Sequence, residues 1–103
     1  YLIAEQIDFD QTIGRVLDFA DSTGDTLVIV LADHETGGFT LSADGDDYNK
    51  IAPTFSTGGH SATMIPVFAY GPGAGQFAGI YENTAIFDKI MALLDPVQDN
   101  PGR

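Results

Sequence analysis

The sequence of 103 residues contains no cysteine. Disulfide bonds and thiolate metal sites are therefore excluded, and any zinc ion bound by this chain must use histidine and carboxylate ligands. Histidine is also scarce, because the only two are His34 and His60. The sequence also lacks an apolar stretch long enough to cross a bilayer as a helix.

Basic residues are few, with four Lys+Arg against 15 Asp+Glu and a formal net charge of −11. A nucleic-acid partner needs a basic face that releases counterions, so this composition argues against one. The same charge argues against an acidic membrane surface as a partner. The excess of carboxylates favours solubility and cation binding, and it suits a salty or extracellular environment. Most of these carboxylates are interpreted as a solvated surface.

Hydrophobic residues make up 44% of the chain, so the sequence is not of the disordered type. A chain of this length buries a modest fraction of its surface and forms at most one compact unit. We therefore predict a single unit over residues 1–103, with a flexible tail at 97–103.

The first half of the chain predicts a helix followed by a buried strand. Apolar residues recur at spacings of three and four over 1–20, which is typical of an amphipathic helix. Residues 21–25 form a stop signal in which Gly24 is the expected left-handed cap. Residues 26–32 are apolar without polar alternation after Thr26, which predicts a strand buried on both faces.

A short β excursion is predicted next. Residues 37–42 read as a second strand, and 43–47 as a turn marked by Asp-Gly. Residues 54–57 are expected to pair back against 39–41. Pro53 is then expected at an edge or just outside that pairing, because proline cannot donate a ladder hydrogen bond.

The last part predicts a third apolar strand at 66–70, a loop to Gly79, and a final helix over 84–94 with Asn83 as its N-cap. The predicted fold class is α/β, as a partial three-layer sandwich. A sheet of central buried strands would be flanked by the N-terminal and the C-terminal helix. The chain is too small to be the whole of such a domain.

Asp33 and His34 end the first apolar strand, shortly before Gly37 and Gly38. Neighbours in a regular strand point to opposite faces, so the pair can share an ion only where the chain has left the strand. Carboxylate plus imidazole suits zinc, which requires three or four protein ligands, and this pair supplies two. His60 also follows a glycine pair, so we expect the two histidines to meet at one site. Taken singly, each also fits a structural reading as a turn carboxylate or a surface histidine.

Other polar residues near these positions have weaker signals. Glu35 is either a general base beside a metal or a solvated or salt-bridged carboxylate. Ser56, Thr57 and Ser61 have no paired base nearby in the sequence, so none is predicted to be a nucleophile. No catalytic residue is therefore assigned within this chain.

Three ordered motifs resemble the carboxyl-terminal part of bacterial alkaline phosphatases: residues 30–38, 55–60 and 67–74. Residues 81–87 are similar to the family's last helix and its approach, and the opening helix is similar to the one after the family's Gly-His metal loop. The resemblance covers nearly the whole chain. The Asp-His pair alone is shared with relatives such as cofactor-independent phosphoglycerate mutases.

The resemblance implies hydrolysis of phosphate monoesters by an enzyme with two zinc ions and a magnesium ion. Asp33 and His34 match ligands of the zinc that activates a serine nucleophile, and His60 matches a ligand of the second zinc. It also implies a periplasmic or extracellular location. A homodimer is expected separately, if an apolar strand edge is exposed.

The family's serine, its magnesium ligands and its remaining zinc ligands have no match in this chain. Neither Arg15 nor Arg103 matches the phosphate-binding arginine. We therefore expect a carboxyl-terminal fragment that is inactive alone and binds zinc poorly. Two alternatives stay open: another enzyme of the superfamily (phosphomutase, sulfatase or phosphodiesterase), or a non-catalytic acidic domain that self-associates.

Overall fold

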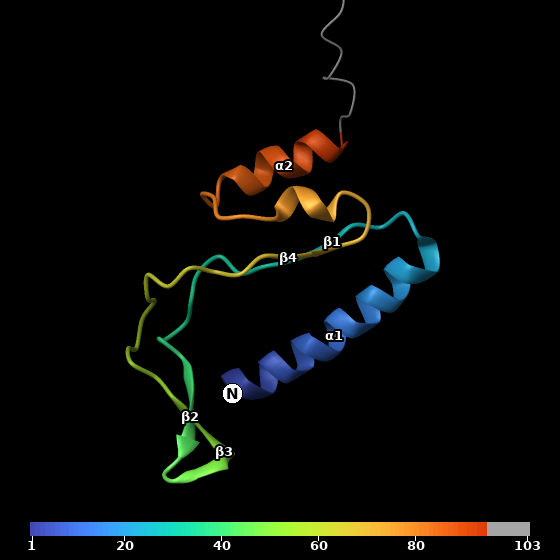
Figure 1. The fold of residues 1–103 in the computed structure, drawn as a ribbon. Coiled ribbons are helices and arrows are strands. Elements are labelled where there is room, and N and C mark those ends of the chain that lie inside the picture. Colours follow the sequence, from blue (N-terminus) through green and yellow to red (C-terminus); the bar gives the residue numbers. More distant parts are fainter. Residues whose placement is uncertain (95–103) are drawn as a thin grey trace, which may run out of the picture. The chain divides into compact units, whose positions relative to one another are not determined.

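The computed structural model describes residues 1–94, and the predicted tail at 97–103 lies outside the described residues. The elements are helix α1 (Leu2–Thr23), strands β1 (Val28–Val30), β2 (Thr40–Asp44), β3 (Asp47–Thr54) and β4 (Phe68–Tyr70), 3₁₀ helix η1 (Ala74–Phe77) and helix α2 (Ala85–Leu94) (Figure 1). The predicted α/β class is confirmed. Among residues 1–94 no helix combines the length and the apolar character needed to cross a membrane.

The chain divides into two compact units where the sequence predicts one. The first contains Tyr1–Val30 and the chain from Val67 onward, and the second is Leu31–Pro66. Strands β1 and β4 pair antiparallel, with Val30 opposite Phe68. The intervening chain therefore departs and returns at the same end of this sheet. It forms its own hydrogen-bonded hairpin, which accounts for its separation as a unit.

Helix α1 is three residues longer at its C-terminus than predicted, and it ends as expected at Gly24. Gly24 has φ 72°, and its N–H donates to the carbonyl of Ala20 over 2.9 Å. Glycine adopts this left-handed conformation without a Cβ penalty. The hydroxyl of Thr23 also donates to the Ala20 carbonyl, over 3.1 Å. These two bonds close the last turn of the helix.

The two predicted apolar strands do pair, but the burial predicted for both faces of residues 26–32 is wrong. Val28 is buried, whereas the other two residues of β1 are partly exposed and Leu31 is 44% exposed. In β4, Phe68 is 64% exposed. The sheet has only two strands, so it is too narrow for neighbouring elements to cover both faces. Helix α1 contacts β1 and η1 contacts β4, while α2 packs on η1. The strands thus lie between helical layers within this unit (Figure 1).

The segment after β4 contains helix η1 where the sequence predicts only a loop. Gly73 has φ 83°, and the N–H of Gln76 donates to its carbonyl over 3.0 Å, which starts the 3₁₀ turn. Helix α2 begins one residue later than predicted. The Lys89 ammonium donates to the Gln76 carbonyl over 2.7 Å and lies 4.3 Å from the centre of the Tyr81 ring. These contacts join α2 to η1.

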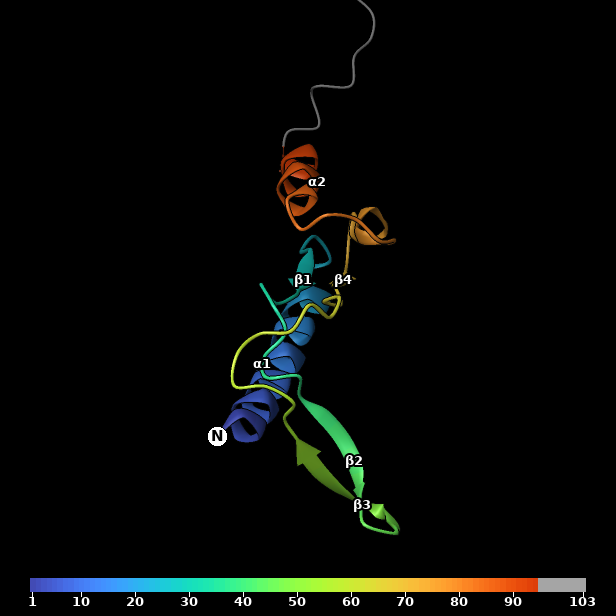
Figure 2. The same ribbon diagram turned by 90° about the vertical axis from the view of Figure 1, so that its left-hand side faces the viewer.

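Strands β2 and β3 form an antiparallel hairpin around a turn at Gly45, which has φ 59° (Figure 2). The predicted turn is confirmed. Of the predicted pairing of 54–57 against 39–41, only Thr54 is confirmed, opposite Thr40, because β3 ends there. Pro53 lies within the pairing, opposite Leu41. Both strands of a two-stranded sheet are edges, so the missing N–H of proline can face away from the partner strand.

Candidate metal centre

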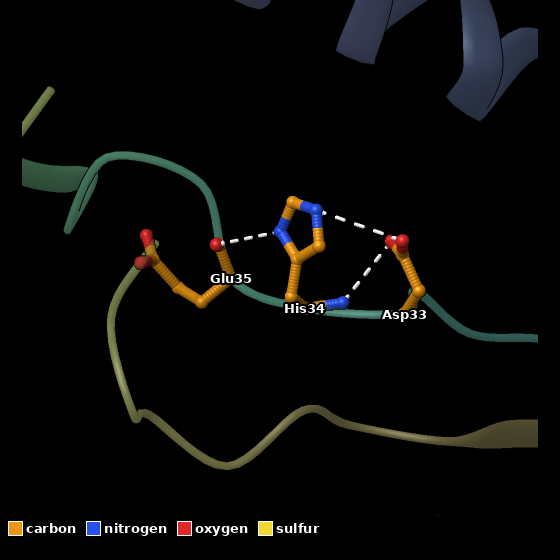
Figure 3. A network of polar contacts seen from close by, with 3 residues as sticks. All are labelled: Asp33, His34 and Glu35. Carbon is orange, nitrogen blue, oxygen red and sulfur yellow. Dashed lines mark hydrogen bonds and ion pairs between the residues drawn. The ribbon is translucent and has the colours of Figure 1, made fainter. Parts of the chain in front are cut away.

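Asp33 and His34 lie in a bend after β1 has ended at Val30. The chain has therefore left the strand, which is the condition for the two side chains to face one ion. The Asp33 Oδ1 accepts the backbone N–H of His34 over 3.1 Å, and its Oδ2 lies 3.6 Å from His34 Nε2 (Figure 3). The Asp33 side chain is 88% exposed and that of His34 is 36% exposed. The carboxylate therefore remains open to a cation from solvent.

The tautomer of His34 follows from its second ring nitrogen. Nδ1 lies 2.9 Å from the backbone carbonyl oxygen of Glu35 (Figure 3). A carbonyl oxygen only accepts hydrogen bonds, so Nδ1 carries the proton in this arrangement. In the neutral ring, Nε2 then has a free lone pair on the side of Asp33. This is the second-sphere bond typical of a metal-binding histidine.

The His60 ring is stacked on the His34 ring, with centroids 3.5 Å apart and 18° between the ring planes. The structure thus brings together the two histidines that the sequence predicts to meet, and Asp33 lies beside them. All three belong to the unit Leu31–Pro66. Within residues 1–94, however, no group of three or more His, Cys, Asp or Glu side chains is arranged to hold one metal ion.

Gly37 and Gly38 let the loop that carries His34 approach the loop that carries His60. Their φ angles are 74° and 59°, in the left-handed region that favours glycine. A Cβ on Gly37 would lie 2.7 Å from Cδ1 of Phe55, and one on Gly38 would overlap the hydroxyl of Ser56. The two loops are therefore in contact at positions where no other side chain fits.

Backbone hydrogen bonds hold these loops together at Gly37. The Gly37 N–H donates to the carbonyl of Gly59 over 2.9 Å. The Gly37 carbonyl accepts the N–H groups of Ser56 and Thr57 over 3.0 and 3.2 Å. Gly59 immediately precedes His60, so these bonds fix the backbone next to the second imidazole.

Glu35 lies next to the predicted ligands, and its contacts in the structure are not evident from the sequence. It is half-buried, its Oε2 accepts the N–H of Gly38 and its Oε1 accepts that of Phe39, each over 2.9 Å. No ion pair involves it among residues 1–94, so the salt-bridged interpretation is wrong there. The glycine pair two and three residues after Glu35 marks a turn, but it does not indicate the direction of the N–H groups that the carboxylate accepts.

The pKa of the Glu35 carboxyl is lowered from its ordinary value. The hydrogen bond from the Ser61 side chain has the largest effect, opposed by partial desolvation, and the N–H groups of Gly38, Phe39 and Ser61 add to the lowering. Each of these donors favours the ionised carboxylate. The N–H groups of Gly38 and Phe39 therefore stabilise the ionised form of Glu35 within its loop.

The hydroxyls near the two histidines make local structural bonds. Thr57 Oγ1 accepts the N–H of Gly59 over 3.1 Å, and Ser61 Oγ donates to Thr63 Oγ1 over 3.1 Å. Neither is hydrogen-bonded to an imidazole among the described residues. That none of these hydroxyls is a nucleophile therefore remains a prediction from the sequence.

The donor atoms fit zinc in kind but are too few to complete a site. One exposed carboxylate, one imidazole with a free Nε2 and a second imidazole are ligands that zinc uses when thiolates are absent. A zinc site needs three or four protein ligands. The described residues can therefore supply part of such a centre, with other ligands coming from outside them.

An α/β fold with carboxylate and imidazole donors gathered on two loops defines a candidate metalloprotein. A family model described as alkaline phosphatase matches residues 2–57, which is just over half of the chain. The chain belongs to the alkaline phosphatase family.

Solved structures and curated relatives agree with this assignment. Alkaline phosphatase from the Antarctic bacterium TAB5 is 63% identical with a TM-score of 0.86, over 90% of this chain and 29% of that one. A mutant of that enzyme with Mg bound in the M3 site is 62% identical with a TM-score of 0.84, over 90% of this chain and 30% of that one. Alkaline phosphatase of Escherichia fergusonii is 30% identical over 108 residues. The match covers 89% of this chain, which spans 23% of that relative's length.

Proposed function

We propose that this chain forms part of a zinc-dependent phosphomonoester hydrolase and supplies Asp33, His34 and His60 to its metal centre. The stacking of the two imidazoles beside an exposed carboxylate is the observation that supports this most strongly. Family membership supports the reaction class, since the relatives are alkaline phosphatases. In this proposal Asp33 and His34 bind one zinc, and His60 binds a second.

Bound zinc ions would supply Lewis-acid stabilisation of the charge that develops on the oxygens during phosphoryl transfer. The chain itself contributes orientation and electrostatics. The Glu35 carbonyl holds the His34 ring with Nε2 available, and Asp33 adds negative charge that attracts the cation. Cations at this position also offset part of the net charge of −11, which otherwise repels a phosphate ester.

A magnesium ion is part of the same proposal. The related structure with Mg bound in the M3 site supports its presence in the complete enzyme. We assign none of its ligands to this chain. We also place the serine nucleophile outside these residues, and we propose a periplasmic or extracellular homodimer as the complete protein.

The first experiment is a phosphomonoesterase assay of the 103-residue chain with added zinc and p-nitrophenyl phosphate. We expect no turnover above that of a His60→Ala control, because the chain holds only part of the ligand set and no nucleophile. Metal-dependent turnover well above this control would show that the chain is a complete enzyme and would overturn this part of the proposal.

The second experiment uses a hybrid enzyme, defined as TAB5 alkaline phosphatase whose aligned segment is replaced by residues 1–94 of this chain. The identity of 63% over 90% of the chain makes this replacement feasible. We expect zinc-dependent hydrolysis of p-nitrophenyl phosphate that is lost in the His34→Ala and His60→Ala forms. A hybrid that folds and binds zinc but hydrolyses only phosphodiesters or sulfate esters would favour another reaction of the superfamily.

A non-catalytic, self-associating chain is the second candidate, and one observation favours it. Large apolar side chains are extensively exposed in both units, including Phe19 at 59%, Phe87 at 67%, Leu41 at 62% and Ile51 at 65%. Exposed apolar surface on this scale promotes association. Light scattering at several concentrations separates the cases, because association raises the apparent mass with concentration whereas a monomer does not.

A further inference from the structure

The proposed function uses Asp33, His34 and His60 and leaves the carboxylate beside them without a role. Glu35 follows His34 directly, yet its side chain points away from the His34 ring (Figure 3). Its two oxygens instead accept the N–H groups of Gly38 and Phe39, each over 2.9 Å. Both oxygens are thus engaged by the protein, which is the arrangement of a structural brace.

The segment that Glu35 braces is itself bonded to the second loop. Gly37, next to Gly38, donates its N–H to the carbonyl of Gly59 and accepts the N–H groups of Ser56 and Thr57. The Glu35 carboxylate therefore fixes the turn through which the loop of His34 is bonded to the loop of His60. Hydrogen bonds to an ionised acceptor are stronger than those between neutral groups.

The bonds between the two loops run through the turn that Glu35 braces. Gly37 bonds Gly59, Ser56 and Thr57 through backbone groups alone. These bonds fix the backbone just before His60, and the Glu35 carboxylate fixes the turn that makes them. His60 is an exposed residue whose ring is stacked on His34. Its position therefore depends on the Gly37 bonds and, through that turn, on the Glu35 side chain.

We propose that Glu35 is a positioning residue, whose carboxylate braces the glycine turn that is bonded to the loop of His60, and so holds the imidazoles of His34 and His60 face to face. The use of the paired imidazoles for metal binding rests on the proposed function. The positioning itself does not, because it concerns only bonds within this chain. Glu35 acts through the two histidines and not as a general base.

The test is NMR of the full 103-residue chain in four forms: unaltered, Glu35→Ala, Glu35→Gln and Glu82→Gln. Glu82 is an exposed carboxylate in the other unit and serves as the matched control. The readouts are cross-relaxation between the ring protons of His34 and His60, and hydrogen exchange of the Gly38 and Phe39 amides. Cross-strand signals between Thr40 and Thr54 report whether the hairpin remains folded.

We expect strong cross-relaxation between the two rings in the unaltered chain and in Glu82→Gln. In Glu35→Ala this signal should disappear, and exchange of the two amides should rise by about tenfold or more, because each loses a charge-assisted bond. Glu35→Gln keeps one oxygen that can accept one of these N–H groups, so both effects should be intermediate. The hairpin signals should persist in all four forms.

Cross-relaxation between the rings that persists in Glu35→Ala would overturn the proposal and leave the proposed function intact. Its absence from the unaltered chain would also overturn the proposal. Disappearance of the hairpin signals in both Glu35 variants would show a general stabilising role in place of positioning.

A zinc titration of the same variants separates the two proposals. Weaker zinc binding in Glu35→Ala, by about tenfold or more, supports both, because displaced imidazoles no longer present their nitrogens to one centre. If the two rings separate in Glu35→Ala while the zinc affinity is unchanged, the positioning role is supported and the result counts against the metal centre.

Discussion

The imidazole rings of His34 and His60 are stacked with their centroids 3.5 Å apart, although 26 positions separate them in the sequence. Two loops from one unit, held together by backbone bonds through Gly37, create this contact. Because both rings are potential zinc ligands, the stack is a structural feature and also part of the proposed metal centre. Substitutions at His60 can test the stacking contact and the metal-binding role separately.

Replacing His60 by phenylalanine should keep the aromatic stack and remove the metal donor. In NMR spectra, the ring protons of His34 should stay shifted by the neighbouring ring in His60→Phe, and should lose that shift in His60→Ala. Zinc affinity should fall in both variants, since neither side chain can bind the ion. Equal zinc affinity in His60→Phe and the unaltered chain would show that His60 is not a ligand.

Gly38→Ala should destabilise the loops that carry the two histidines. Gly38 has φ 59°, and a Cβ there would overlap the hydroxyl of Ser56. The left-handed conformation alone costs a non-glycine residue about 1–2 kcal/mol, and the overlap adds to this. Chemical denaturation followed through loop and hairpin NMR signals measures the loss. A Gly38→Ala chain as stable as the unaltered one would show that the loops do not approach as closely as described.

Gly14→Ala should act in the opposite direction. Gly14 lies inside helix α1, and a Cβ added there would meet no atom within 4 Å. Alanine is favoured over glycine in a helix interior by about 1 kcal/mol, so this variant should be more stable by up to that amount. The helical circular dichroism signal should melt at a higher temperature. A lower melting temperature would indicate that Gly14 contacts another element.

Tyr70 should titrate at a higher pH than an ordinary tyrosine. Its hydroxyl donates to Asp21 Oδ1 over 2.6 Å, and this hydrogen bond, followed by the negative charge of Asp21, raises the pKa of Tyr70. A raised pKa in the folded state means that the contribution to stability is complete below the unfolded pKa of about 10. It is then lost as the pH rises through the folded pKa.

NMR of tyrosine ring carbons during an alkaline titration can measure this pKa. In Asp21→Ala the Tyr70 pKa should fall back toward the ordinary value, because both causes are removed. A Tyr70 titration that is the same with and without Asp21 would show that the pair does not form in solution.

Local sequence signals predicted the ends of several elements well. Gly24 was correct as the cap of α1, and the Asp-Gly turn of the hairpin was correct, because both depend on glycine at positive φ. The strands were harder, since 26–32 and 66–70 contribute only three residues each to the sheet. Their burial depends on how many strands pair, which a local pattern does not encode.

The candidate site was likewise predicted from the sequence only in part. Glycine pairs before His60 and after His34 indicated that both lie on turns, and this led to the correct expectation that the rings meet. The role of Glu35 could not be predicted, because it depends on the directions of the Gly38 and Phe39 N–H groups. Those directions are set by tertiary contact between two loops and not by the type of residue.

The most direct test of the proposed metal centre is cadmium NMR of the hybrid enzyme after its zinc ions are replaced by cadmium. We expect separate signals for the two proposed sites. Asp33→Ala and His34→Ala should perturb or remove the same signal, and His60→Ala should perturb or remove the other. If all three substitutions leave both signals and the metal content unchanged while the hybrid remains folded, these residues are not ligands and the proposed function of this chain is wrong.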